Sequence, residues 1–307
     1  MTRQFKKLAL CFVIATAGWA QLTTSAYAAT NPAFDAFQSG EYLTAIKEAE
    51  KAAAKGDAAA HTLLGEIYSK GLGANRDEAL AASWYEKGAK LGDANAQLAL
   101  GVMLNEGRGV KKDKARAATL FEKAAKKGLA SAQYNLALVL IEGRVRKTNI
   151  SEAVAWLQKA ADQDHAQALY DLSGVYASEG PSSNPEKALG LLKRSATLGH
   201  ASAQLEYAIK QFNGKGVAKD EAAAIKLFRA AAEKGNPVAQ NRLAHIYANG
   251  ATNFPENPVE ATKWHLLARD AGASDFVLDV YITRLTPEQR AKAESAAEKW
   301  AYNKLGS

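Results

Sequence analysis

The chain has 307 residues, a formal net charge of +7 and a single cysteine, Cys11. One cysteine excludes an internal disulfide, and a chain that has lost Cys11 has no thiol for catalysis or for a metal site. Charges of both signs alternate along the sequence, and it has no basic stripe of the kind that nucleic-acid binding requires.

The first 28 residues have the pattern of a secretory signal peptide. Arg3, Lys6 and Lys7 form a basic start, an apolar run covers 8–20, and Ala26–Ala28 is a small-x-small cleavage site. A retained membrane anchor is the alternative, but the run is shorter than the roughly 20 apolar residues that span a bilayer. We predict cleavage after Ala28 and a periplasmic or secreted protein. Cleavage leaves 36 basic residues against 32 acidic ones, a net charge of +4.

Residues 29–55 resemble a shortened version of the units that follow them. Phe34, Phe37, Tyr42 and Ile46 provide an apolar face that we expect to cover the first full unit. Terminal units of repeat proteins differ from the central ones because only one of their faces meets a neighbour. We therefore predict an N-terminal capping half-repeat over 29–55.

A glycine then returns about every 36 residues, and a second glycine follows each of its occurrences at a similar period. A period in the range of about 20–50 residues indicates one helical or strand unit copied in tandem. Asp164 fills the single vacant slot of the first series. The first series is Gly56, Gly92, Gly128, Gly199, Gly235 and Gly272, and the second is Gly71, Gly107, Gly143, Gly180, Gly214 and Gly250.

The first half of each unit reads as a helix. Apolar positions recur at spacings of three and four residues, and small residues stand at the start and in the middle of the segment. Small residues allow a neighbouring helix to approach closely. The second glycine is predicted to end this helix in the left-handed conformation that glycine adopts without strain.

The second half of each unit reads as another helix. It opens with Asp or Asn, which accept hydrogen bonds from the free amides of a helix start. Alanine follows four residues later, and a large apolar pair such as Trp84-Tyr85 comes after it. The predicted capping residues are Asp77, Asp113, Asn149, Asn184, Asp220 and Asn257.

Residues 273–307 leave the periodic pattern. Thr286 and Pro287 form a helix start, with threonine as the cap and proline at the first helical position. The predicted helix runs to about Asn303 and directs Ala293, Ala297 and Trp300 toward the stack. We interpret it as a C-terminal capping helix.

The repeated pattern resembles the Sel-one-like repeat family, a relative of the tetratricopeptide repeat. The similarity rests on the run from Ala60 to Gly73, on Trp84-Tyr85 and on the matching positions of residues 96–125. It implies an all-α, right-handed superhelical solenoid of helix pairs that binds partner proteins. Its members are adaptors and regulators, frequently bacterial and exported. The predicted repeats are 56–91, 92–127, 128–163, 164–198, 199–234 and 235–272.

No catalytic or metal-binding pattern emerges from the remaining residues. None of the five histidines pairs with another at a spacing of three or four residues, so a helical metal site is not encoded. The Gly-x-Gly turns follow helices rather than strands, which argues against a dinucleotide site. We predict a protein that is not an enzyme and that has no metal and no cofactor. The histidines are His61, His165, His200, His245 and His265.

By the tetratricopeptide analogy, the first helix of each unit lines a concave groove. Its apolar and aromatic side chains suit a partner helix or an extended peptide. A tightly wound superhelix would instead bury the same side chains between repeats, and the sequence favours neither alternative. The predicted partner-binding residues are Leu98, Val102, Tyr134, Leu138, Ile141, Tyr170, Leu205, Ile209, Phe212 and His245.

Two functions remain open at this stage. The first is a periplasmic interaction scaffold that docks on the outer domain of a sensor or on an envelope assembly complex. The second is an enzyme or small-ligand binder that acts on cell-wall material. An enzyme would need clustered carboxylates or histidines in the groove, and the groove positions supply one glutamate and one histidine at opposite ends. We favour the scaffold, with no nucleic acid and no membrane insertion after cleavage.

Overall fold

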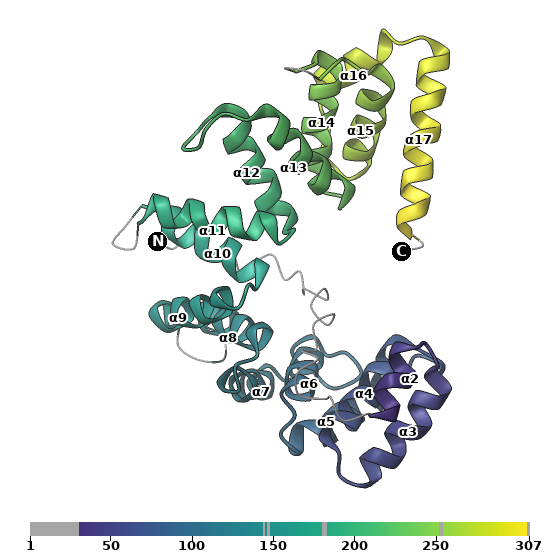
Figure 1. Ribbon diagram of the computed structural model, residues 1–307, viewed down its shortest axis with the longest axis vertical. Coiled ribbons are helices and arrows are strands. Elements are labelled where there is room, and N and C mark those ends of the chain that lie inside the picture. The colour runs from purple at the N-terminus through teal and green to yellow at the C-terminus, as the bar shows by residue number, and fades with distance from the viewer. Residues whose placement is uncertain (1–30, 144, 146–147, 180–182, 252–253, 306–307) are drawn as a thin grey trace. The chain divides into compact units, whose positions relative to one another are not determined.

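The computed structural model describes residues 31–143, 145, 148–179, 183–251 and 254–305, and the predicted signal peptide and its cleavage site lie outside these ranges. The described residues form sixteen helices and no named strand (Figure 1). The chain divides into two compact units, unit 1 ending at Ala168 and unit 2 beginning at Leu169. The prediction of an all-α repeat solenoid is confirmed.

Helices of nearly constant length follow one another in pairs. Unit 1 contains α2 (Pro32–Gln38), α3 (Tyr42–Ala54), α4 (Ala58–Lys70), α5 (Glu78–Lys90), α6 (Ala94–Glu106), α7 (Lys114–Lys126), α8 (Ala130–Glu142) and α9 (Ile150–Asp162). Helix α10 (Ala166–Ala177) contains the boundary between the units. Unit 2 contains α11 (Pro185–Thr197), α12 (Ala201–Asn213), α13 (Glu221–Glu233), α14 (Pro237–Asn249), α15 (Pro258–Asp270), α16 (Phe276–Thr283) and α17 (Pro287–Leu305).

The predicted Asp and Asn caps begin the second helix of each of the six repeats. In α7, for example, Asp113 Oδ1 accepts a hydrogen bond from the Arg116 amide at 2.9 Å. The Asp113 amide donates to the Leu104 carbonyl at 2.8 Å and so fixes the loop to the end of α6. All six predicted caps accept such a bond from their own helix: Asp77, Asp113, Asn149, Asn184, Asp220 and Asn257.

The second glycines end the first helices as predicted in four of the five described cases. Gly71, Gly107, Gly143 and Gly214 are left-handed, but Gly250 combines a φ of 70° with a ψ of 173°. That prediction is wrong for Gly250, because its loop closes through an Ala251–Phe254 bridge instead. Gly180 lies outside the described residues.

The vacant slot of the first glycine series keeps the same backbone conformation. Asp164 has a φ of 61°, and it is the non-glycine residue with positive φ in the described part of the chain. Short polar side chains tolerate this conformation better than most others. The repeat therefore specifies a backbone shape at this position rather than glycine itself.

The small residues in the middle of the first helices allow an aromatic ring to pack against the helix. A Cβ placed on Gly65 would lie 2.6 Å from the Tyr85 ring, and one placed on Gly101 would lie 2.7 Å from the Phe121 ring. Both rings belong to the second helix of the same pair and are buried. The small column thus sets how closely the two helices of a repeat approach.

At the N-terminal end, α2 and α3 form a helix pair that packs onto α4. Their buried residues are alanines, whereas Phe34 is half-buried and Phe37 and Ile46 pack at the edge of the cluster. Small residues therefore form the inner contact of this cap. The larger side chains cover its sides.

The C-terminal end contains the predicted capping helix and one helix that the sequence pattern did not predict. Thr286 and Gln289 cap α17 reciprocally, Ala293 and Ala297 are buried, and the helix packs along α15 (Figure 1). The additional helix is α16, which Asp275 begins. None of the helices in the described part is long and apolar enough to cross a membrane.

Candidate functional site

A cavity of about 290 Å³ opens on the first-helix side of unit 2. It is lined by the last turns of α12 and α14 and by Phe228 of α13. Three of the predicted groove residues, Ile209, Phe212 and His245, line it together. We call it the apolar cavity, and its residues are Ile209, Phe212, Asn213, Phe228, Arg242, His245, Ile246, Asn249 and Gly250.

Aromatic and aliphatic side chains form the walls of the apolar cavity. The Phe212 and Phe228 rings lie 6.2 Å apart between centroids, at an angle of 59°. Ile246 is buried, and Ile209 and Phe212 are half-buried. Such a wall suits one or two apolar side chains of a partner, because burial of aromatic and aliphatic surface dominates interface energies.

Polar groups at the rim of the cavity are held in place from α16. His245 Nε2 lies 2.8 Å from Asp275 Oδ2, and Asn241 Nδ2 donates to the same oxygen at 3.2 Å. Burial raises the pKa of the Asp275 carboxyl, but the hydrogen bonds from His245, Asn241 and the Leu278 amide lower it to about 2. The carboxyl is therefore ionised at neutral pH. It can only accept, so His245 Nε2 carries the proton and donates.

The remaining predicted groove residues divide into two groups. Leu98, Tyr134 and Ile141 are less than a tenth exposed, so they belong to the packing of unit 1 in the free chain. Val102 and Leu138 of unit 1 and Tyr170 and Leu205 of unit 2 are half-buried.

The two tyrosines of this set lie against histidines of the following repeat, stacked for Tyr134 and tilted for Tyr170. The Tyr134 and His165 ring centroids are 4.9 Å apart, and those of Tyr170 and His200 are 4.7 Å apart. Each histidine caps a first helix, with Nδ1 accepting from the amide three residues on at 3.2 Å. Sequence analysis missed this role. The signal for it is the column Asp57, Asp93, Leu129, His165, His200 and Asn236, in which five of six residues can accept a hydrogen bond.

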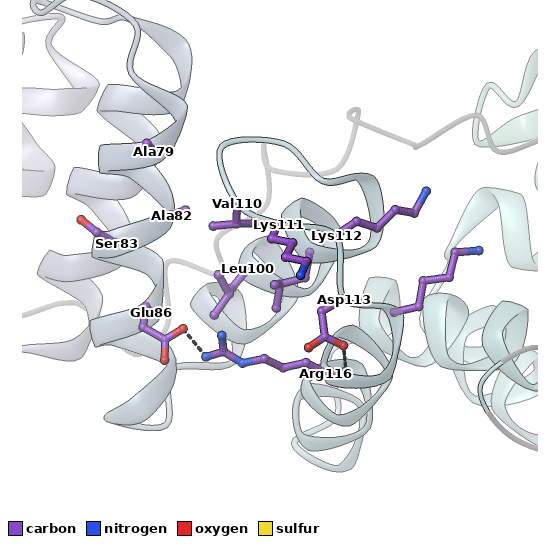
Figure 2. Close-up of a pocket in the computed structure, with 12 residues that line it drawn as sticks. Ala79, Ala82, Ser83, Glu86, Leu100, Val110, Lys111, Lys112, Asp113 and Arg116 are labelled. Carbon is purple, nitrogen blue, oxygen red and sulfur yellow. Dashed lines mark hydrogen bonds and ion pairs between the residues drawn. The ribbon is translucent and has the colours of Figure 1, made fainter.

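A larger cavity of about 740 Å³ lies on the second-helix side of unit 1 (Figure 2). It is open between α5 and α7, with α6 beneath it and the loop at 110–112 beside it. Sequence analysis missed it, although the run Lys111-Lys112-Asp113-Lys114 was a signal. We call it the cationic cavity, and its residues are Ala79, Ala82, Ser83, Glu86, Leu100, Leu104, Val110, Lys111, Lys112, Asp113, Lys114 and Arg116.

Neither cavity contains a recognisable catalytic arrangement. Within the residues that the structure describes, no group of three or more His, Cys, Asp or Glu side chains is placed to hold a metal ion.

Comparison with known proteins gives one family. Six consecutive matches to the Sel1 repeat cover residues 58–93, 94–129, 130–165, 166–200, 201–236 and 237–272. A search of the curated proteins finds no match.

Two solved structures extend the comparison. A Sel1 repeat protein from Oxalobacter formigenes is 28% identical with a TM-score of 0.72, and the alignment covers 78% of this chain and 98% of that one. A protective antigen of uropathogenic Escherichia coli with an SLR fold is 26% identical with a TM-score of 0.54, covering 88% of this chain and 67% of that one.

Proposed function

Because the chain belongs to the Sel1 repeat family, whose members generally mediate protein–protein interactions, we propose that it is a non-enzymatic scaffold or regulator that binds a partner protein through its first helices. The observation that carries this proposal is the apolar cavity, where Ile209, Phe212 and His245 converge. Phe212 supplies an accessible aromatic edge, and Asp275 fixes the orientation of His245. A pre-formed pocket of this kind suits an anchor side chain of a partner.

We further propose that the partner is met outside the cytoplasm. The basic start, the apolar run and the small-x-small site of residues 1–28 support export and cleavage. N-terminal sequencing of the protein from a periplasmic extract should give Ala29 as the first residue. A product that begins at Met1 and fractionates with membranes would contradict export.

Photo-crosslinking in cells tests the proposed binding face. The photoreactive residue p-benzoylphenylalanine is placed at Phe212, which lines the apolar cavity, and in a second strain at Glu233, which is exposed on α13. Illumination should attach a protein partner at position 212 and not at position 233. No adduct at 212, or the same adducts at both positions, would refute binding through this face.

A truncation variant measures the contribution of the anchor. Phe212→Ala should weaken binding of the crosslinked partner by roughly 1–3 kcal/mol, because central aromatic anchors dominate interface energies. Tyr134→Ala provides the contrast, since Tyr134 is 8% exposed and its removal should lower the free energy of unfolding by about 3 kcal/mol.

A further inference from the structure

The cationic cavity has the shape of a docking site for side chains. Its floor consists of Ala82, Leu100 and Leu104, which are at most 3% exposed, and Val110 borders it from the loop. Figure 2 shows the opening between α5 and the start of α7, with Val110 and Lys111 beside it. The volume of about 740 Å³ has room for several side chains.

Four of the lining residues are cations, and the two lining carboxylates are already engaged. Glu86 pairs with Arg116 and with Lys90, and Asp113 caps α7. Lys114 reaches Glu142 at 2.9 Å. Within the described part of the chain, Lys111 and Lys112 form no ion pair and are exposed. The cavity therefore presents the Lys111 ammonium group above an apolar floor, while Lys112 extends outward from the rim and also acts on the Glu106 carboxyl (Figure 2).

The fifth repeat shows that the fold does not require three of these four cations, since only Lys112 has a lysine, Lys219, at the matching position. The fifth repeat has the same Gly-x-Gly-Val loop, and Asp220 caps its second helix with the same 2.9 Å bond that Asp113 makes. At the positions of Lys111, Lys114 and Arg116, the fifth repeat has Ala218, Glu221 and Ala223.

The interaction of charged side chains with the helix dipole does not explain the cations at the start of α7 either. The first turns of α5, α9, α11, α13 and α15 each contain a glutamate, which suits the positive end of a helix dipole. Helix α7 has no acidic residue there and begins with Lys114 and Arg116 instead. The pairs with Glu142 and Glu86 offset part of this repulsion. No such pair is formed by Lys111 or Lys112 in the described residues.

We infer that the cationic cavity is a second docking site, which binds an acidic segment of a partner protein. An apolar side chain of that segment fills the floor over Leu100 and Leu104, and neighbouring carboxylates meet Lys111 and Lys112. Charge complementarity identifies the occupant, because a surplus of cations around an apolar floor selects a peptide that carries both features. A nucleic acid would need an extended basic stripe instead. The inference rests on the proposed function only in taking a protein as the partner.

Peptide selection tests this site with defined probes. A random peptide library displayed on phage is selected on the purified protein, and the recovered peptides are labelled and titrated by fluorescence anisotropy. Peptides bound here should carry Asp or Glu beside Leu, Ile or Phe. Lys111→Ala/Arg116→Ala, which installs the residues of the fifth repeat, should weaken their binding about tenfold or more. Added salt should weaken it too.

Two further variants show whether the peptides occupy the cavity itself and whether loss of any single cation would weaken their binding. Ser83→Trp places a large side chain at an exposed position of the rim and should block the same peptides without changing any charge. Lys219→Ala is the control for general loss of charge. It removes the cation that matches Lys112 in the fifth repeat, outside the cationic cavity, and should leave peptide binding unchanged. Unchanged melting curves establish that the variants fold.

The outcomes distinguish the two proposals. Recovered peptides without acidic residues, or peptides that bind the Lys111→Ala/Arg116→Ala variant equally well, would overturn the cationic site while leaving crosslinking at Phe212 intact. Loss of crosslinking at Phe212 together with retained acidic-peptide binding would refute the first-helix face alone. A DNA duplex that displaces the peptides at lower concentration than unlabelled peptide would also overturn the inference.

Discussion

The helix pairs of the repeats and the C-terminal cap bury their surfaces with different chemistry. Inside a repeat, glycine and alanine bring two helices together, as where Phe121 packs on Gly101. In the cap, α16 is fixed to α14 and α15 by His245–Asp275 and by a second histidine–aspartate pair, His265–Asp279. The close approach of two helices recurs from repeat to repeat because the small residues recur in the sequence. Each histidine–aspartate pair of the cap, in contrast, occurs once.

Removal of His265 should produce the largest loss of stability. The side chain is fully buried, and its Nε2 lies 2.7 Å from Asp279 Oδ1. His265→Ala leaves a cavity and removes the nearer partner of the Asp279 carboxylate, which keeps Arg269 at 3.7 Å, so the free energy of unfolding should fall by about 2–4 kcal/mol. Urea unfolding followed by circular dichroism measures the change.

His245→Ala is the matched control within the cap. The side chain of His245 is 30% exposed, so water replaces much of what it loses, and the cost should be about 1 kcal/mol. Equal losses in the two variants would mean that burial does not distinguish the two pairs.

A methyl group at Gly101 should produce the next largest effect. The added Cβ would lie 2.7 Å from the buried Phe121 ring, and the resulting overpacking should cost about 1–3 kcal/mol. Gly174→Ala is the control, because a Cβ there meets nothing within 4 Å. That substitution should stabilise α10 by about 0.5–1 kcal/mol through the better helix propensity of alanine. A loss in Gly174→Ala would contradict the steric explanation.

These effects show which parts of the fold the sequence could predict. Gly101, Asp113 and their counterparts act on backbone within their own repeat, so their periodic recurrence was enough to predict helix pairs and caps. Helix α16 was not predicted, because it lies outside the periodic pattern. Its cap Asp275 bonds the Val277 and Leu278 amides locally, but the contact that joins it to α14 is with His245, 30 residues away in sequence. Phe276 and Val277 at its start are apolar but exposed, so the hydrophobic pattern there does not indicate which face of the helix is buried.

The same distinction applies to the candidate sites. Ile209 and His245 occupy one groove-facing column of the repeat and Phe212 occupies another, so all three were predicted, and they line one cavity. The burial of Tyr134 was not predictable, since it depends on stacking against His165. The cationic cavity requires α5, α6 and α7 together, and a single repeat does not contain all of its walls.

A smaller effect is expected at the end of α6. Gly107 has a φ of 80°, and a Cβ there would lie 3.2 Å from the Lys112 Cβ. The left-handed conformation disfavours any residue with a Cβ, so Gly107→Ala should cost about 1–2 kcal/mol. Gly250→Ala provides a comparison at a position with a similar φ but a different ψ, in the loop that leads toward the cap. Thermal melts of the two variants should show losses of the same order, and a neutral Gly107→Ala would contradict the strain argument.

The smallest expected effect is a difference in pH dependence between the stability that His200 contributes to a repeat and the stability that Asp275 contributes to the cap. Burial, followed by the charge of Lys234, lowers the pKa of His200 below its ordinary value near 6.5. The unfolded chain therefore binds the proton more readily, and the stability contributed by neutral His200 is complete above that ordinary value and is lost as pH falls below it. Protonation also removes the Nδ1 acceptor that caps α12. The contribution of Asp275, whose pKa is about 2, persists to lower pH and is lost only as pH falls from about 3.8 through 2.

Hydrogen exchange at graded pH resolves the two contributions by position. After correction for the intrinsic exchange rate, protection of the first turn of α12 should begin to fall below about pH 6.5, while protection of the first turn of α16 should persist to about pH 4 and fall only below it. His200→Asn, which introduces the cap that Asn236 provides in the sixth repeat, should remove the first change and leave the second. Loss of protection in α16 before α12 would reverse the order that the two pKa shifts require, and it would show that the cap opens independently of Asp275.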